Sequence, residues 1–74
     1  MSTAVITKPT KAQVRAKQKS GTVLVFRDEG DGHDAATCSD KDIWYVTGVE
    51  PEYSLNDLFS SWVSEPLALF YEED

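Results

Sequence analysis

The sequence has few of the residues that build covalently linked or metal-stabilised scaffolds. Cys38 is the only cysteine among 74 residues, so neither an internal disulfide framework nor a cysteine-rich zinc site can form. No apolar run approaches the ~20 residues that a helix needs to cross a bilayer, and the first residues lack the apolar stretch of a secretory signal. These absences predict a soluble protein of a reducing cytoplasm, without a membrane partner.

Signatures of catalysis and of phosphate binding are also missing. The sequence contains no glycine-rich loop followed by lysine and no dinucleotide fingerprint. An acidic, glycine-containing loop starts at Asp28, but its sixth and twelfth positions are His33 and Ser39, where an EF-hand has glycine and glutamate. We therefore predict no metal, no cofactor and no enzymatic activity. A metal-assisted hydrolase using Asp31, His33 and Asp34 is the enzymatic alternative.

Two further pairs of side chains could in principle perform chemistry. His33 and Cys38 could act as a base and a thiol nucleophile, but the neighbouring aspartates raise the thiol pKa and no oxyanion donor is apparent. We expect Cys38 to be a small buried or half-buried residue and His33 to lie in a loop. Glu50 and Glu52 flank Pro51, which is more typical of a solvated turn than of a catalytic carboxylate pair.

Charge is distributed very unevenly along the chain. Five of the seven basic residues lie in the first twenty positions, where no acid occurs, and all thirteen acids follow. Residues 1–20 therefore carry a net charge of +5 and residues 21–74 carry −11, within a total of −6. We divide the chain into a basic N-terminal arm, residues 1–20, either disordered or a marginal helix, and a compact acidic domain, residues 21–74.

The arm contains one helical pattern. Residues 4–7 could form a short strand, but Pro9 follows it at once. From Lys11 to Lys19 the composition favours a helix, with Thr10 as its N-cap and Gln13 completing a capping box. Repulsion between like charges four residues apart weakens this helix, so we expect it to fray until it meets a negative surface.

The remaining sequence predicts an α+β fold. Strands are expected at residues 22–27 and 42–47, joined antiparallel by a loop of about fourteen residues. Ser54 caps a helix whose apolar stripe is Leu55, Leu58, Phe59 and Trp62, and Pro66 ends it before a last strand at residues 67–71. The expected order is strand, strand, helix, strand: a small, mainly antiparallel sheet with one packed amphipathic helix.

Binding to a protein partner explains the charge pattern better than binding to nucleic acid. The acidic body would repel a duplex, and the apolar residues of the arm are too small for a membrane surface. We expect a monomeric protein whose arm binds an acidic protein groove, with one exposed aromatic side chain as an additional anchor. The candidate partner-binding residues are Lys8, Lys11, Arg15, Lys17, Lys19, Tyr45 and Tyr71.

The acidic body supports an alternative function. Spaced carboxylates can mimic a nucleic-acid backbone and block the basic channel of a nuclease or another DNA-binding defence enzyme. The candidate residues for such mimicry are Asp28, Glu29, Asp31, Asp34, Glu50 and Glu52.

In its length, its basic start and its acidic, aromatic end (Leu67-Ala-Leu-Phe-Tyr-Glu-Glu-Asp74), the chain resembles the small host-takeover proteins of lytic bacteriophages. The resemblance is to small phage transcription regulators that bind bacterial RNA polymerase. It implies inhibition of promoter initiation by displacement of the sigma factor, together with antitermination on the elongating polymerase. It also implies that the protein acts in the cytoplasm of a host bacterium, on a large host complex.

Overall fold

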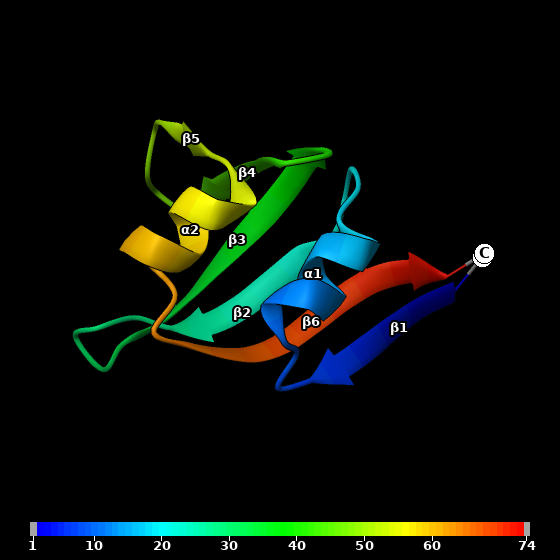
Figure 1. Cartoon of the computed structure of the whole chain (residues 1–74), viewed down its shortest axis with the longest axis horizontal. Coiled ribbons are helices and arrows are strands. Elements are labelled where there is room, and N and C mark those ends of the chain that lie inside the picture. The colour runs from blue at the N-terminus through cyan, green and yellow to red at the C-terminus, as the bar shows by residue number, and fades with distance from the viewer. Residues whose placement is uncertain (1, 74) are drawn as a thin grey trace.

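Six strands form one open antiparallel sheet with two short helices in the computed structural model, which describes residues 2–73 (Figure 1). The elements are β1 (Ser2–Thr7), α1 (Lys11–Lys17), β2 (Val23–Arg27), β3 (His33–Asp40), β4 (Ile43–Val46), β5 (Glu52–Tyr53), α2 (Leu55–Ser61) and β6 (Glu65–Glu73). Their order across the sheet is β1-β6-β2-β3-β4-β5, and every neighbouring pair is antiparallel. The predicted α+β class with a mainly antiparallel sheet is confirmed.

The predicted fourteen-residue loop between the first two expected strands is wrong, because most of it is strand β3. Asp28 shortens the connection to a tight turn: its Oδ1 accepts hydrogen bonds from Gly30 N (2.9 Å) and Gly32 N (3.0 Å). β3 then pairs with both β2 and β4, so the two expected strands are not neighbours. β3 was not predicted because many of its residues are polar or small, so its sequence shows no clear alternation of apolar and polar side chains. In the structure buried and exposed side chains do alternate, as Cys38 (buried) and Thr37 (exposed) show.

The basic N-terminal segment differs most from the expected arm. β1 pairs with β6 over six residues, from Ser2 opposite Glu73 to Thr7 opposite Ala68. The first and last strands therefore lie side by side in one sheet (Figure 1). The division into a separate arm and body does not appear in the packing, since the last strand of the body supplies hydrogen-bonding partners for the first residues.

The predicted helix in the basic segment is present as α1, with its predicted capping box. Thr10 Oγ1 accepts a hydrogen bond from Gln13 N at 3.1 Å, and Thr10 N donates to Gln13 Oε1 at 2.8 Å. Val14 is the residue of this short helix that faces the core, and it is completely buried. Tertiary packing of Val14 thus stabilises a helix that is too short and too positively charged to be stable alone.

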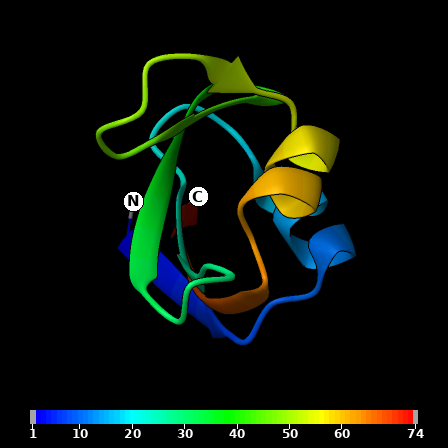
Figure 2. The same ribbon diagram turned by 90° about the vertical axis from the view of Figure 1, so that its left-hand side faces the viewer.

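Both helices lie on the same face of the sheet (Figure 2). Alternation along the strands directs the largest buried side chains, including Leu24, Phe26 and Trp44, towards this face. The second helix, α2, begins after Ser54 as predicted and buries Leu55 and Leu58. In the described part of the chain no helix lies on the other face (Figure 2). By alternation along the strands, the exposed apolar residues of that face include Val5, Tyr45 and Phe70.

One buried hydrogen bond attaches the end of α1 to the core. Trp44 Nε1 donates to Gln18 Oε1 at 2.9 Å, and both side chains are buried.

Replacing Gln18 by leucine is expected to lower the free energy of unfolding by about 1–3 kcal/mol, because the indole N–H loses its acceptor inside the core. Urea unfolding measures the effect. Trp44→Phe should then cost less in the Gln18→Leu background than in the wild type; equal costs would contradict the coupling.

Candidate protein-binding site

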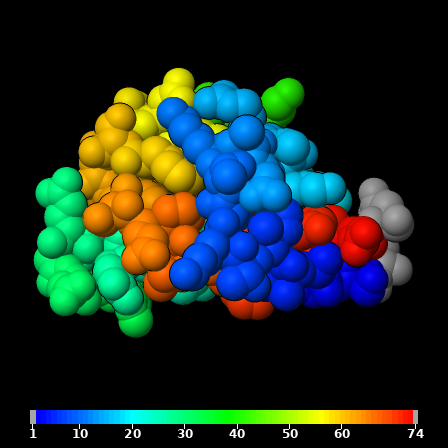
Figure 3. All heavy atoms as spheres, turned by 60° about the horizontal axis from the view of Figure 1, so that its bottom comes forward, coloured from blue at the N-terminus to red at the C-terminus, as the bar shows by residue number. Residues whose placement is uncertain are grey.

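The basic side chains of the N-terminal segment form a positively charged surface on and around α1. We call this set, Lys8, Lys11, Arg15, Lys17 and Lys19, the basic surface; all five residues are exposed. Figure 3 shows the atoms of α1 at the surface between those of α2 and the end of β6. Within residues 2–73 no member forms an ion pair at 4.0 Å or less, since both ion pairs found there belong to Arg27. Among the described residues, therefore, no acid lies within ion-pair distance of the basic surface.

Aromatic rings and one amide border the basic surface. The Lys17 ammonium lies 5.0 Å from the centre of the Tyr71 ring, and the Lys11 ammonium lies 6.0 Å from that of Phe59. Arg15 Nη2 donates a hydrogen bond to Asn56 Oδ1 at 2.9 Å. These contacts hold the cations in position without cancelling their charge. Tyr71 was predicted from the sequence, whereas Phe59 and Asn56 were not, because no local pattern shows that α1 and α2 are neighbours.

A surface hollow of about 350 Å³ lies where the end of α1 meets the end of β6. Lys17 and Lys19 line one side of it, and Tyr71, Glu72 and Glu73 line the other. The hollow therefore offers a partner both charges and an aromatic ring at one edge of the basic surface.

Tyr45, the other aromatic candidate, lies away from the basic surface on the helix-free face of the sheet. Its side chain is 40% exposed, and its hydroxyl donates a hydrogen bond to a Glu52 carboxylate oxygen at 2.8 Å. This hydrogen bond, together with the charge of Glu52, raises the pKa of Tyr45 above its ordinary value of 10.0. Tyr45 thus lies apart from the other partner-binding candidates. It is hydrogen-bonded instead to Glu52, one of the acids predicted to mimic a nucleic-acid backbone.

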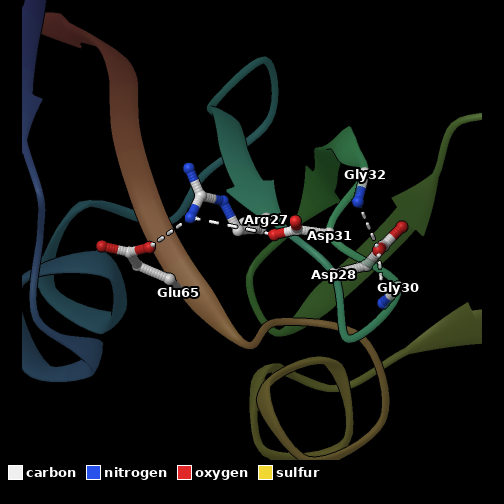
Figure 4. Close-up of polar contacts among 6 residues, drawn as sticks. All are labelled: Arg27, Asp28, Gly30, Asp31, Gly32 and Glu65. Atoms are coloured by element: carbon white, nitrogen blue, oxygen red, sulfur yellow. Dashed lines mark hydrogen bonds and ion pairs between the residues drawn. The ribbon is translucent and has the colours of Figure 1, made fainter.

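The predicted acidic set does not form one continuous array. Asp28 and Asp31 lie in the β2–β3 turn, whereas Glu52 lies in β5, at a separate corner of the molecule (Figure 1). Arg27 Nη1 lies 4.0 Å from an Asp31 oxygen and 3.6 Å from a Glu65 oxygen, which reduces the negative charge at the turn (Figure 4). The Asp28 carboxylate accepts hydrogen bonds from the backbone amides of Gly30 and Gly32 (Figure 4).

The other predicted acids are also dispersed. Asp34 is half-buried on β3, and its Oδ1 accepts a hydrogen bond from Ala35 N at 2.9 Å. Glu29 and Glu50 are exposed, Glu29 in the β2–β3 turn and Glu50 before β5. Mimicry of a nucleic-acid backbone requires regularly spaced carboxylates along one surface. The six predicted acids are not arranged in this way.

His33 and Cys38, the possible base and thiol nucleophile, do not form a catalytic pair. His33 is exposed at the first position of β3 rather than in a loop, while Cys38 is buried further along the same strand. Burial raises the pKa of the Cys38 thiol, and its Sγ donates a hydrogen bond to the Asp40 carbonyl at 2.8 Å. A protonated, enclosed thiol is a poor nucleophile. No cluster of three or more potential metal ligands occurs among the residues that the structure describes.

Comparison with protein-family models, curated proteins and solved structures finds no match for this chain. In the described part of the chain, neither helix has the length and apolar character needed to span a bilayer.

Proposed function

We propose that the protein is a non-enzymatic regulator that binds an acidic patch of a large host protein complex through its basic surface. The observation that carries this proposal is that five exposed cations form no ion pair with the acids of residues 2–73: Lys8, Lys11, Arg15, Lys17 and Lys19. Opposite charges across an interface steer association and select the partner. Five exposed cations without an ion pair to any acid of residues 2–73 are suited to an acidic partner.

The basic surface has features of a protein-binding site in addition to charge. α1 is anchored by buried Val14 and by Gln18, so its cations are presented from an ordered element and less entropy is lost on binding. Tyr71 and Phe59 add partly buried aromatic rings beside Lys17 and Lys11. Aromatic and basic side chains together are typical of residues that dominate binding energies.

Bacterial RNA polymerase is our first choice of partner, because the chain resembles small phage regulators in its format and charge pattern. On this proposal the protein acts in the bacterial cytoplasm as a host-takeover factor. Its binding inhibits promoter initiation by displacing the sigma factor, and it acts as an antiterminator on the elongating enzyme.

The first experiment is a pulldown from bacterial lysate, read by mass spectrometry, with the wild-type chain and the Lys11→Glu/Arg15→Glu variant. Lys41→Glu serves as a control, because Lys41 is exposed in the β3–β4 connection, outside the basic surface. RNA polymerase subunits captured by the wild type and the control, but not by the double variant, would support the proposal. An initiation assay would then test for sigma displacement.

The acidic mimic predicts a different pattern. A nuclease or another DNA-binding enzyme captured equally by all three chains would overturn binding through the basic surface. In that case charge reversal of body acids such as Asp31 and Glu52 should remove binding, whereas reversal of the basic residues should not.

A further inference from the structure

Among residues 2–73, strand β1 has a hydrogen-bonded neighbour, β6, on one side only. It lies at the outer end of the strand order, and its free edge is visible in Figure 1. Sequences often protect such edges with charge, proline or a bulge, because unpaired backbone groups can pair with another chain. Ser2–Thr7 contains no charged residue and no proline, and its pairing with β6 shows no register shift.

The pairing with β6 identifies the backbone groups that face outwards. Lys8 N donates to Leu67 O at 2.8 Å, one position beyond the last pair of the ladder, Thr7 opposite Ala68. Opposite residues in an antiparallel ladder alternate between hydrogen-bonded and non-hydrogen-bonded pairs. Counting back from Lys8, the N–H and C=O groups of Thr3, Val5 and Thr7 point away from β6, towards the free edge.

We propose that β1 pairs antiparallel with β1 of a second copy of this chain, forming a two-fold symmetric dimer with a continuous twelve-stranded sheet. The register with Val5 opposite Val5 of the second copy also places Thr3 opposite Thr7. This register uses all the outward-facing groups of Thr3, Val5 and Thr7, and each opposed pair exchanges two hydrogen bonds.

Side chains at this edge are also complementary in the proposed register. Val5 is 54% exposed and pairs with Phe70, which is 41% exposed on the same helix-free face. Pairing of the two β1 strands forms one apolar row, in which the two valines are central and a phenylalanine flanks each of them. Such cross-strand contacts between aromatic and β-branched side chains stabilise a sheet.

Charge supports a second copy as the occupant of this edge. In this register Thr7 of the second copy lies opposite Thr3, and Lys8 follows it where the chain leaves the ladder with a φ of 49°. This places Lys8 near the end of β6, where Glu72 and Glu73 lie opposite Thr3 and Ser2, and long side chains of opposite charge attract over about 10 Å. Two-fold symmetry repeats the arrangement, so two attractive contacts flank a neutral centre.

Sedimentation velocity from about 1 µM to about 1 mM, the range of weak specific association, tests the dimer with two variants of one residue. Val5→Pro removes the outward N–H but no hydrogen bond to β6, so its monomer should fold. Val5→Thr keeps the β-branched shape and the N–H. We expect Val5→Pro to raise the dimer dissociation constant about tenfold or more, and Val5→Thr to change it less than about threefold. Circular dichroism shows whether each variant is folded.

Amide hydrogen exchange of the wild type, measured by NMR, locates the interface. At low concentration the amides of Ala4 and Ile6 should be protected and those of Thr3, Val5 and Thr7 should exchange rapidly; at high concentration all five should be protected. A chain that stays monomeric throughout, or a dimer whose Thr3, Val5 and Thr7 amides still exchange rapidly, would overturn the proposal. The test is independent of the polymerase proposal, because it contains only this protein.

Discussion

The Lys11→Glu/Arg15→Glu variant is expected to bind purified RNA polymerase about a hundredfold more weakly than the wild type at ~0.1 M salt. Each substitution replaces an attraction by a repulsion, and exposed charge pairs contribute up to about 1 kcal/mol each. The two reversals together should cost about 2–3 kcal/mol of binding free energy. Fluorescence anisotropy with labelled protein measures both affinities.

Salt and a matched single substitution separate a local effect from a general one. Lys11→Glu and Lys41→Glu change the net charge equally, but only Lys11 belongs to the basic surface. We expect Lys11→Glu to weaken binding about tenfold and Lys41→Glu less than about threefold. The affinities of the double variant and the wild type should converge as salt rises to about 0.5 M, because screening weakens exposed charges. Equal losses for Lys11→Glu and Lys41→Glu would contradict a specific basic surface.

Replacing Leu24 by alanine is expected to lower the free energy of unfolding by about 2–5 kcal/mol. Leu24 is completely buried on the helix-covered face of β2, where it lies opposite Leu69 of β6 and Ala36 of β3. Its truncation leaves a cavity at the centre of the sheet, where neighbouring strands restrict collapse. For a domain of this size the loss is a large part of the total stability.

The adjacent residue is the control for this prediction. Val23 is half-buried and points to the helix-free face, where it lies opposite Phe70 and Thr37. Val23→Ala should cost at most about 1 kcal/mol, mainly through lower β-propensity and reduced cross-strand packing. Chemical unfolding in urea measures both variants. A cost for Val23→Ala as large as that for Leu24→Ala would mean that both faces of the sheet are buried, in conflict with Figure 2.

Elements with strong local signals were predicted well. The apolar, β-branched run of residues 22–27 corresponds to β2, and the capping residues Thr10 and Ser54 mark the starts of α1 and α2. These signals are local: propensity and capping act between residues a few positions apart. Weak local signals were misread. β3 has polar and small residues at many positions, and the two-residue strand β5 is too short to show a period.

Parts of the candidate site were also readable. The five cations of the basic surface lie close together in the sequence and can be recognised there as a group, and all five are exposed. Their neighbours were not readable, since Asn56 lies 41 positions from Arg15 and is brought to it only by the packing of the helices. The two tyrosine candidates looked equivalent in the sequence, yet Tyr71 borders the basic surface and Tyr45 lies on the other face of the sheet.

The sequence by itself determined the α+β class, the starts of both helices, the strand at β2 and the segregation of charge, because each depends on composition or on neighbouring residues. Only the tertiary structure decided that the basic segment contributes strand β1 to the sheet, that β3 lies between β2 and β4, and that both helices of residues 2–73 lie on one face of the sheet. Those features depend on contacts between distant residues. β1 is a strand because β6, more than sixty residues later, supplies its hydrogen-bonding partners.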